Sequence, residues 1–127
     1  MATKEEQIEA LLNCKALELA CRELNVSHMA RSSYTDVFTV TRQEIDEYIR
    51  INGIPKNRYC TRSDSHPCEG IHLVGKKDSW HLYWLERGIV SGEEIFSDYQ
   101  EAQKRLLDWI LGMAGTGIDF TQQGHAR

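Results

Sequence analysis

The chain has 127 residues, 41% of them apolar and 27% charged, and a formal net charge of −4. This length fits one domain, residues 1–127, with residues from about 115 onward as a loose tail. No apolar run approaches the roughly 18 residues of a membrane span, and the polar, acidic N-terminus lacks a secretory signal pattern. We therefore expect a cytoplasmic protein without membrane contact. The negative charge and the absence of a large basic cluster argue against direct nucleic-acid binding.

A first helix is predicted over Lys4–Leu24, where apolar residues recur at three- and four-residue steps. Thr3 and Glu6 form a capping-box pattern before it, and Asn25 can end it in a left-handed conformation. The chain has four cysteines, which we expect to be reduced thiols in the cytoplasm. The first two lie seven positions apart in this helix and are expected to be buried or half-buried: Cys14, Cys21, Cys60 and Cys68.

A second helix is predicted after Thr41, which repeats the capping box with Glu44. Asn52-Gly53 stops this helix. The stretch Tyr34–Val40 between the two helices fits a short strand or a loop equally well. The apolar stripe of the second helix consists of Ile45, Tyr48, Ile49 and Ile51.

Strands follow in the second half of the chain. Gly75–Asp78 has the composition of a four-residue hairpin connection, and Gly88 and Gly92 bracket a further turn. A short strand near the start of this region precedes an exposed loop. The predicted strands are Arg58–Thr61, Ile71–Val74, Ser79–Arg87 and Glu93–Phe96.

A last helix is predicted to begin after Ser97 as its cap and to end at Gly112 and Gly115. In the tail, Ile118 and Phe120 are the apolar side chains that can pack back onto the domain. The fold class is α+β, with N-terminal helices, an antiparallel sheet of three to five strands and a C-terminal helix packed on the sheet. The apolar stripe of the last helix consists of Tyr99, Ala102, Leu106, Trp109, Ile110 and Met113.

The strand Ser79–Arg87 is apolar on both faces, whereas a strand of a small antiparallel sheet usually has one polar face. Coverage by helices on one side and loops on the other explains this pattern. The alternative is an aromatic surface for a partner or for a second copy. One face carries Trp80, Leu82 and Trp84, and the other carries His81, Tyr83 and Leu85.

Neither a metal site nor a cofactor site is predicted. The candidate zinc ligands have intervening spacings of five, one and three residues and contain no C-x-x-C pair. These residues are Cys60, His66, Cys68 and His72. A small Cys/His enzyme would need a thiolate beside a histidine, and no local signature places Cys68 beside His28, His72 or His81.

Carboxylates gather near the second helix and the third strand. The adjacent pairs Glu93-Glu94 and Asp46-Glu47 point in different directions, so neither is a ready acid/base couple. A solvated surface explains these residues, and so does a recognition patch for a basic partner such as the substrate cleft of a nuclease. The acidic set is Glu44, Asp46, Glu47, Glu86, Glu93, Glu94 and Asp98.

The run WHLYWLERGIVSGEEIFSDYQEAQKRLLDWIL resembles a pattern found in small bacterial immunity proteins. A hairpin strand ends in Glu86-Arg87-Gly88, the next strand carries Phe96, and the closing helix contains Ala102. The resemblance covers Glu69–Leu111. It implies a non-enzymatic protein that binds and neutralises a cognate toxin domain, as in contact-dependent growth inhibition.

The leading hypothesis is therefore a cytoplasmic immunity protein whose partner is the C-terminal domain of a toxin, most simply a nuclease. The alternatives are a homodimeric structural or regulatory module, and a small enzyme that uses Cys68. Charge and expected exposure select the partner-binding residues Glu44, Asp46, Glu47, Trp80, Tyr83, Glu93, Glu94 and Asp98.

Overall fold

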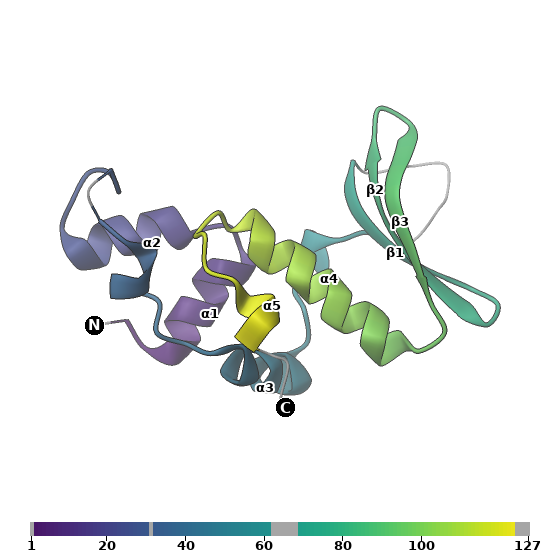
Figure 1. Cartoon of the computed structure of the whole chain (residues 1–127), viewed down its shortest axis with the longest axis horizontal. Helices are drawn as coiled ribbons and strands as arrows, with labels where there is room; N and C mark the ends of the chain where they lie inside the picture. Colours follow the sequence, from purple (N-terminus) through teal and green to yellow (C-terminus); the bar gives the residue numbers. More distant parts are fainter. Residues whose placement is uncertain (1, 31, 62–68, 124–127) are drawn as a thin grey trace. The chain divides into compact units, whose positions relative to one another are not determined.

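The computed structural model describes residues 2–30, 32–61 and 69–123 (Figure 1). The chain divides into two compact units. The helical unit comprises residues 1–54 and 108–127, and the sheet unit comprises residues 55–107. The fold is α+β, as predicted. None of the helices in these described ranges has the length and apolar character needed to cross a bilayer.

The helical unit begins with α1 (Lys4–Leu12) and α2 (Ala16–Leu24) and continues with α3 (Arg42–Asn52). Both predicted capping boxes are confirmed, before α1 and before α3. Each threonine side chain stabilises the start of its helix because it accepts a hydrogen bond from a backbone N–H that has no partner within the helix. The buried apolar side chains of this unit include Ile8, Leu11, Leu12, Leu19, Val37, Phe38, Ile45, Ile49 and Ile110.

The single helix predicted over Lys4–Leu24 is wrong, because the chain turns between Leu12 and Ala16. Cys14 there adopts a left-handed φ of 58°. Its side chain is exposed, not buried as expected, and only Cys21 is half-buried within a helix. The apolar spacing continues across the break, so periodicity alone could not reveal it. The predicted left-handed end at Asn25 is confirmed by a φ of 55°.

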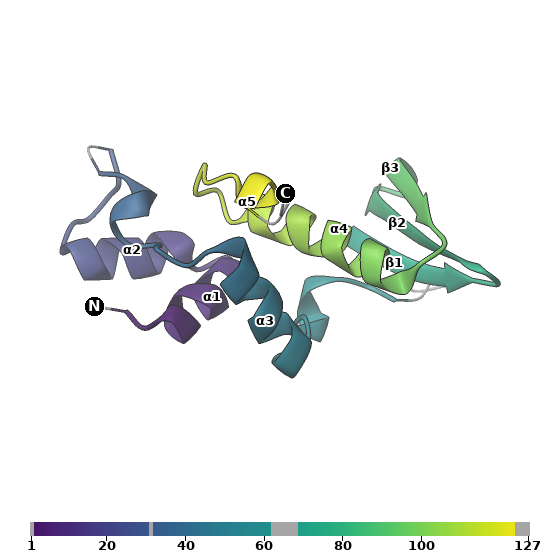
Figure 2. The ribbon, with the colours of Figure 1, turned by 60° about the horizontal axis from the view of Figure 1, so that its bottom comes forward.

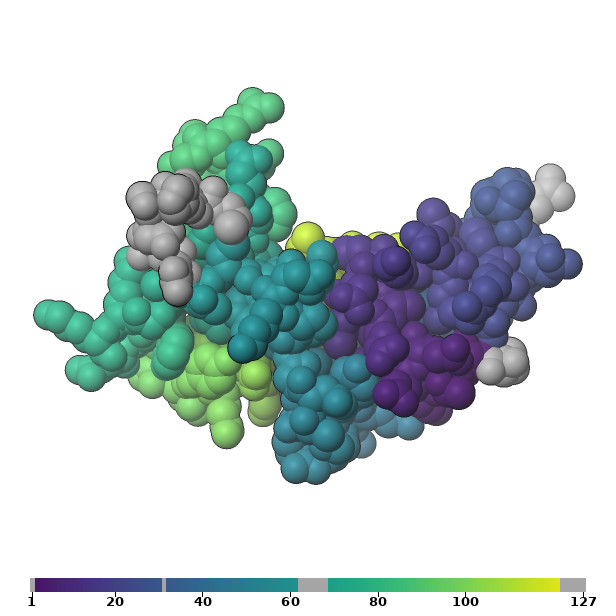
Figure 3. Space-filling view, turned by 180° about the vertical axis from the view of Figure 1, so that it is seen from behind, coloured from purple at the N-terminus to yellow at the C-terminus, as the bar shows by residue number. Residues whose placement is uncertain are grey.

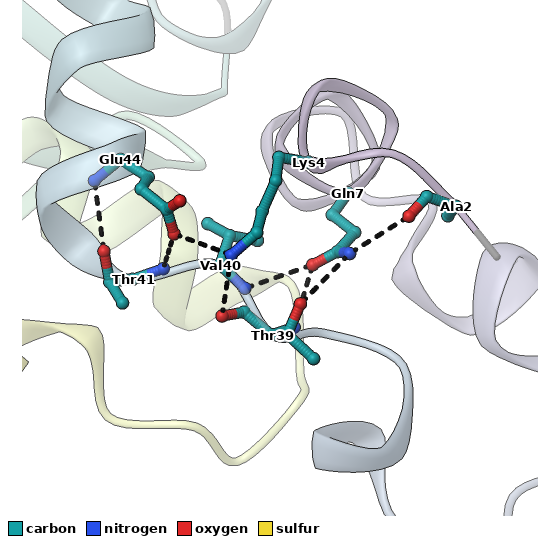
Figure 4. Close-up of polar contacts among 7 residues, drawn as sticks. All are labelled: Ala2, Lys4, Gln7, Thr39, Val40, Thr41 and Glu44. Carbon is teal, nitrogen blue, oxygen red and sulfur yellow. Dashed lines mark hydrogen bonds and ion pairs between the residues drawn. The ribbon is translucent and has the colours of Figure 1, made fainter.

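Between α2 and α3, the residues Tyr34–Asp36 form a short 3₁₀ helix, and the described residues up to Val40 contain no strand. Gln7 of α1 takes over the hydrogen bonding that a strand partner would provide (Figure 4). Its side-chain oxygen accepts from the amides of Thr39 (2.8 Å) and Val40 (3.1 Å). This segment is therefore held by a side chain.

Arg42 lies buried at the start of α3. Its guanidinium donates to Asp108, to Asp46 at 2.9 Å and to the Phe120 carbonyl at 3.5 Å. Burial lowers the pKa of Arg42, but the two carboxylates outweigh it and the net shift is upward. Phe120, in α5 (Phe120–Gln123), is buried, so this part of the tail does pack back. Ile51 departs from the predicted stripe and is exposed.

The sheet unit contains β1 (Gly70–Lys76), β2 (Ser79–Glu86) and β3 (Ile89–Phe96), paired antiparallel in the order β1-β2-β3 (Figure 1). Lys77 and Asp78 alone form the first turn, so the predicted four-residue connection is two residues too long. Gly75 belongs to β1. A Cβ at this position would lie 2.9 Å from Cζ3 of Trp80, so packing rather than turn geometry favours this glycine.

The third strand begins at Ile89, earlier than the predicted Glu93, and the turn before it consists of Arg87-Gly88. Gly92 lies inside the strand at a β-bulge, where the register shifts between Leu82 and Trp84. Its φ of 64° explains the glycine. The predicted strand Arg58–Thr61 is reduced to one parallel bridge between Cys60 and His72. The loop that follows, with His66 and Cys68, lies outside the described residues.

The long helix α4 (Tyr99–Met113) has its first residues, up to Leu107, in the sheet unit. The cap is Asp98, not the predicted Ser97: its carboxylate accepts from the Gln100 amide at 3.0 Å. Within the sheet unit, α4 packs on the sheet as predicted, with the ring of Tyr99 edge-on to Trp80 at 4.7 Å. The helix continues through Gly112, one of its two predicted stops, to Met113.

Candidate interaction surfaces

The eight predicted partner-binding residues are divided between the two units. All six carboxylates have partners within the protein. Glu44, Asp46 and Glu47 lie on α3 of the helical unit, and Trp80, Tyr83, Glu93, Glu94 and Asp98 lie in the sheet unit.

On α3, Glu44 closes the capping box and also accepts from Nζ of Lys4 on α1 at 3.0 Å (Figure 4). The backbone N–H of Thr41 and then Lys4 lower the pKa of Glu44. Glu47 pairs with Arg50, which lowers the pKa of Glu47. Glu44 is half-buried and Glu47 is exposed, so these surface ion pairs contribute modestly to stability and leave both carboxylates accessible to a partner.

In the sheet unit, one face of β2 is covered by α4. Glu94 of β3 accepts from Nε of Arg105 on α4 at 2.9 Å and from its Nη2 at 3.2 Å. This two-point contact joins the third strand to the helix. Trp80 lies on the same face, half-buried over Gly75 and against Tyr99. The covered-strand explanation therefore applies to this face of β2.

The opposite face of the sheet carries a stacked aromatic pair. The rings of His72 and Tyr83 are 5.1 Å apart with an angle of 11°, and both side chains are buried. Burial first, then the charge of Glu93, raises the pKa of Tyr83. As it lies, the ring of Tyr83 offers little surface to a partner. The alternation of β1 places His72 on this face, but no pattern in the sequence predicts that its side chain is buried.

A hydrogen-bonded series of side chains from β2 and β3 lies on this same face of the sheet. Nε2 of His81 lies 3.0 Å from the hydroxyl of Ser79, and its Nδ1 lies 2.9 Å from Oε2 of Glu93. This order of hydroxyl, imidazole and carboxylate is the one found in serine hydrolases. The Ser79 hydroxyl also donates to the Lys76 carbonyl at 3.1 Å, which competes for its proton. Sequence analysis missed this series because the bulge positions Glu93.

One open pocket of about 380 Å³ lies in the helical unit. Its walls carry hydroxyl, amide and apolar groups but no charged side chain, so it has no electrostatic selectivity. Across the described ranges, no three His, Cys, Asp or Glu side chains are arranged to hold a metal ion. The pocket is lined by Thr35, Phe38, Thr39, Val40, Thr41, Gln43 and Ile118.

The two units differ in net charge and in the distribution of their exposed apolar side chains. The helical unit has seven Lys and Arg against eleven Asp and Glu, whereas the sheet unit has eight of each, so the net charge of −4 belongs to the helical unit. The sheet unit has three of its exposed large apolar side chains on one strand, β3: Ile89 at 68%, Val90 at 49% and Ile95 at 61%. In the helical unit such side chains are spread over different helices, as at Leu17 of α2 and Ile51 of α3.

Comparison of the chain with protein-family models, with curated proteins and with solved structures gives no match.

Proposed function

We propose that this protein is an immunity protein, which binds a cognate toxin domain and neutralises it without catalysis of its own. The observation that carries the proposal is the structure of the stretch resembling such proteins. From Gly70 to Leu107 it forms three antiparallel strands closed by a helix, within one compact unit. Phe96 and the buried Ala102 lie on the strand and the helix that the resemblance requires.

The charge of the helical unit supports a nuclease as the toxin. A nuclease binds its substrate through a basic cleft, because phosphates must be neutralised. Helices α1 and α3 adjoin within the helical unit (Figure 3) and are linked by the Lys4–Glu44 ion pair. Their exposed carboxylates include Glu5, Glu9 and Glu47. Such a surface can occupy a basic cleft and also speed association.

Co-expression tests the proposal directly. The domain to test is the C-terminal domain of any large secreted protein that is encoded immediately upstream of this chain. Expression of that domain alone should stop growth, and co-expression of this chain should restore it. A toxic domain that remains toxic, and that does not bind the purified chain, would exclude this function.

Charge reversal identifies the binding surface. Glu5→Lys with Glu47→Lys should slow association with the toxin, because exposed charges act mainly on the association rate. Asp78→Lys with Glu101→Lys changes the net charge equally in the sheet unit and should have a smaller effect. Reversal of all six predicted carboxylates should also raise the dissociation rate. Unchanged binding after those six changes would remove them from the binding surface.

A second candidate function, ester hydrolysis, is favoured by the Ser79–His81–Glu93 series alone. The Ser79 oxygen would attack the ester carbonyl as its proton passes to Nε2 of His81. The imidazolium, oriented by Glu93, would return that proton to the departing alkoxide, and water would then release the acyl group. Turnover of p-nitrophenyl acetate that disappears in Ser79→Ala would support this activity. Equal rates for Ser79→Ala and the wild type would exclude it.

A further inference from the structure

β3 is an edge strand of eight residues. One side pairs with β2, and no other strand of the described residues pairs with its outer side. Exposed backbone N–H and C=O groups on a long edge readily pair with another strand. Because β3 also exposes Ile89, Val90 and Ile95, pairing there would bury apolar surface as well.

Most of the usual protection of an edge strand is missing here. The sequence IVSGEEIF contains no lysine and no proline. Its two charges are directed to partners inside the sheet unit, since Glu93 pairs with His81 and Glu94 with Arg105. Only the bulge at Gly92 interrupts the edge.

The register with β2 assigns each residue of β3 to a face of the sheet. Val90 and Ile95 lie opposite Leu85 and His81, which share one face. On the other face, Ile89, Ser91, Glu94 and Phe96 lie opposite Glu86, Trp84, Leu82 and Trp80. Gly92 and Glu93 together occupy the single position opposite Tyr83.

These faces make β3 complementary to itself. We propose that β3 pairs antiparallel with β3 of a second copy, about a twofold axis through the bulge, to form a six-stranded sheet. Val90 then lies opposite Ile95 of the second copy on one face, and Ile89 opposite Phe96 on the other. Ser91 lies opposite Glu94, so no two carboxylates oppose each other.

The alternation of the strand selects this register. Pairing centred on Gly92 alone would set Ile89 against Ile95, which belong to opposite faces of the sheet. It would also set Val90 against Glu94, which again belong to opposite faces. The dimer thus rests on the pattern of β3 and is independent of the proposed immunity function.

Sedimentation velocity of the full chain over a wide concentration range tests the proposal. The wild type should shift from monomer to dimer as the concentration rises. Val90→Lys and Ile95→Glu should each raise the dimer dissociation constant at least about tenfold, a loss of ~1.4 kcal/mol. Leu17→Lys, which also adds a charge at an exposed apolar position but on α2, should dimerise like the wild type.

The double variant tests the register. Val90→Lys with Ile95→Glu places a lysine opposite a glutamate twice across the proposed axis and should restore the dimer, now weakened by added salt. A monomeric wild type, dimers indifferent to both single changes, or a double variant that stays monomeric would each overturn the proposal. If the variants fail to fold, hydrogen exchange of the wild type decides instead: the amides of β3 should exchange more slowly at high concentration, and equal exchange overturns the proposal.

Discussion

Gln7 should contribute strongly to the stability of the helical unit, although it takes no part in the proposed functions or in the proposed dimer. It is only 2% exposed, and it joins α1 to the backbone that leads into α3 (Figure 4). Besides accepting from two amides, it donates to the Ala2 carbonyl at 3.3 Å and to the Thr39 hydroxyl at 3.4 Å. Gln7→Met keeps the length and helix propensity of the side chain but removes all these bonds.

The expected loss follows from the amides left behind. An unsatisfied buried amide costs roughly 1–3 kcal/mol. The amide of Val40 is fully buried and should incur that cost, whereas the amide of Thr39 is partly buried and can regain a water molecule. The gain in apolar burial of methionine offsets a part of this loss. We expect the free energy of unfolding to fall by about 2 kcal/mol.

Urea unfolding followed by circular dichroism measures this change, with a constant m-value as the test that the same structure unfolds. Gln43→Met is the matched control: the same substitution on α3, at an exposed side chain, should change stability by less than about 0.5 kcal/mol. If Gln7→Met were as stable as this control, the view that a side chain replaces a strand partner would be wrong.

Three further predictions concern packing and ionisation. Gly75→Ala should cost about 1–3 kcal/mol by overpacking against the ring of Trp80, and the cost should vanish in a Trp80→Leu background. Because the pKa of Glu44 is lowered in the folded protein, its ionised carboxylate stabilises the fold at pH values above the ordinary pKa of 4.5. This stabilisation is lost as the pH falls through the pKa of the folded protein. Glu44→Gln should therefore be less stable than the wild type at neutral pH but not in acid, whereas the control Glu18→Gln should show no such pH dependence. Burial raises the pKa of Tyr83 above 10.0, so Tyr83→Phe should remove a component of the tyrosinate absorbance titration that appears at high pH. As the pH rises beyond 10.0, the wild type should also lose stability relative to Tyr83→Phe.

Features set by neighbouring residues could be predicted from the sequence. The capping boxes at Thr3 and Thr41 depend on residues three positions apart, and the left-handed end at Asn25 depends on one residue. The antiparallel strands also followed, because alternation and turn residues are local signals. The same reasoning failed at Cys14, where a break leaves the apolar spacing intact.

Two glycines show why local sequence signals do not predict every feature of the sheet. Gly75 and Gly92 were both assigned to turns, the commonest use of glycine between strands. In the structure, Gly75 makes room for a tryptophan on the neighbouring strand, and Gly92 forms a bulge. Both reasons depend on pairing with β2, which a single sequence does not specify.

The predicted partner-binding residues could be predicted only in part, because their contacts depend on residues that are distant in sequence. The positions of the acidic residues could be read directly, but their partners are distant in sequence, as for Glu44 with Lys4 and Glu94 with Arg105. The exposed apolar edge could not be predicted, because the predicted strand begins at Glu93 and excludes Ile89 and Val90. In the structure, β3 includes these two residues, and the proposed self-complementary pairing depends on them.

The two proposed interactions should differ in their sensitivity to ionic strength, because they use different physical forces in different units. Toxin binding through the acidic helical unit should associate more slowly as salt screens its charges. Pairing of β3 buries apolar side chains whose neighbouring carboxylates are already paired, so the wild-type dimer should be nearly insensitive to moderate salt. A toxin whose binding ignored salt and was abolished by Val90→Lys would instead assign recognition to the strand edge. The helical unit would then have no part in it.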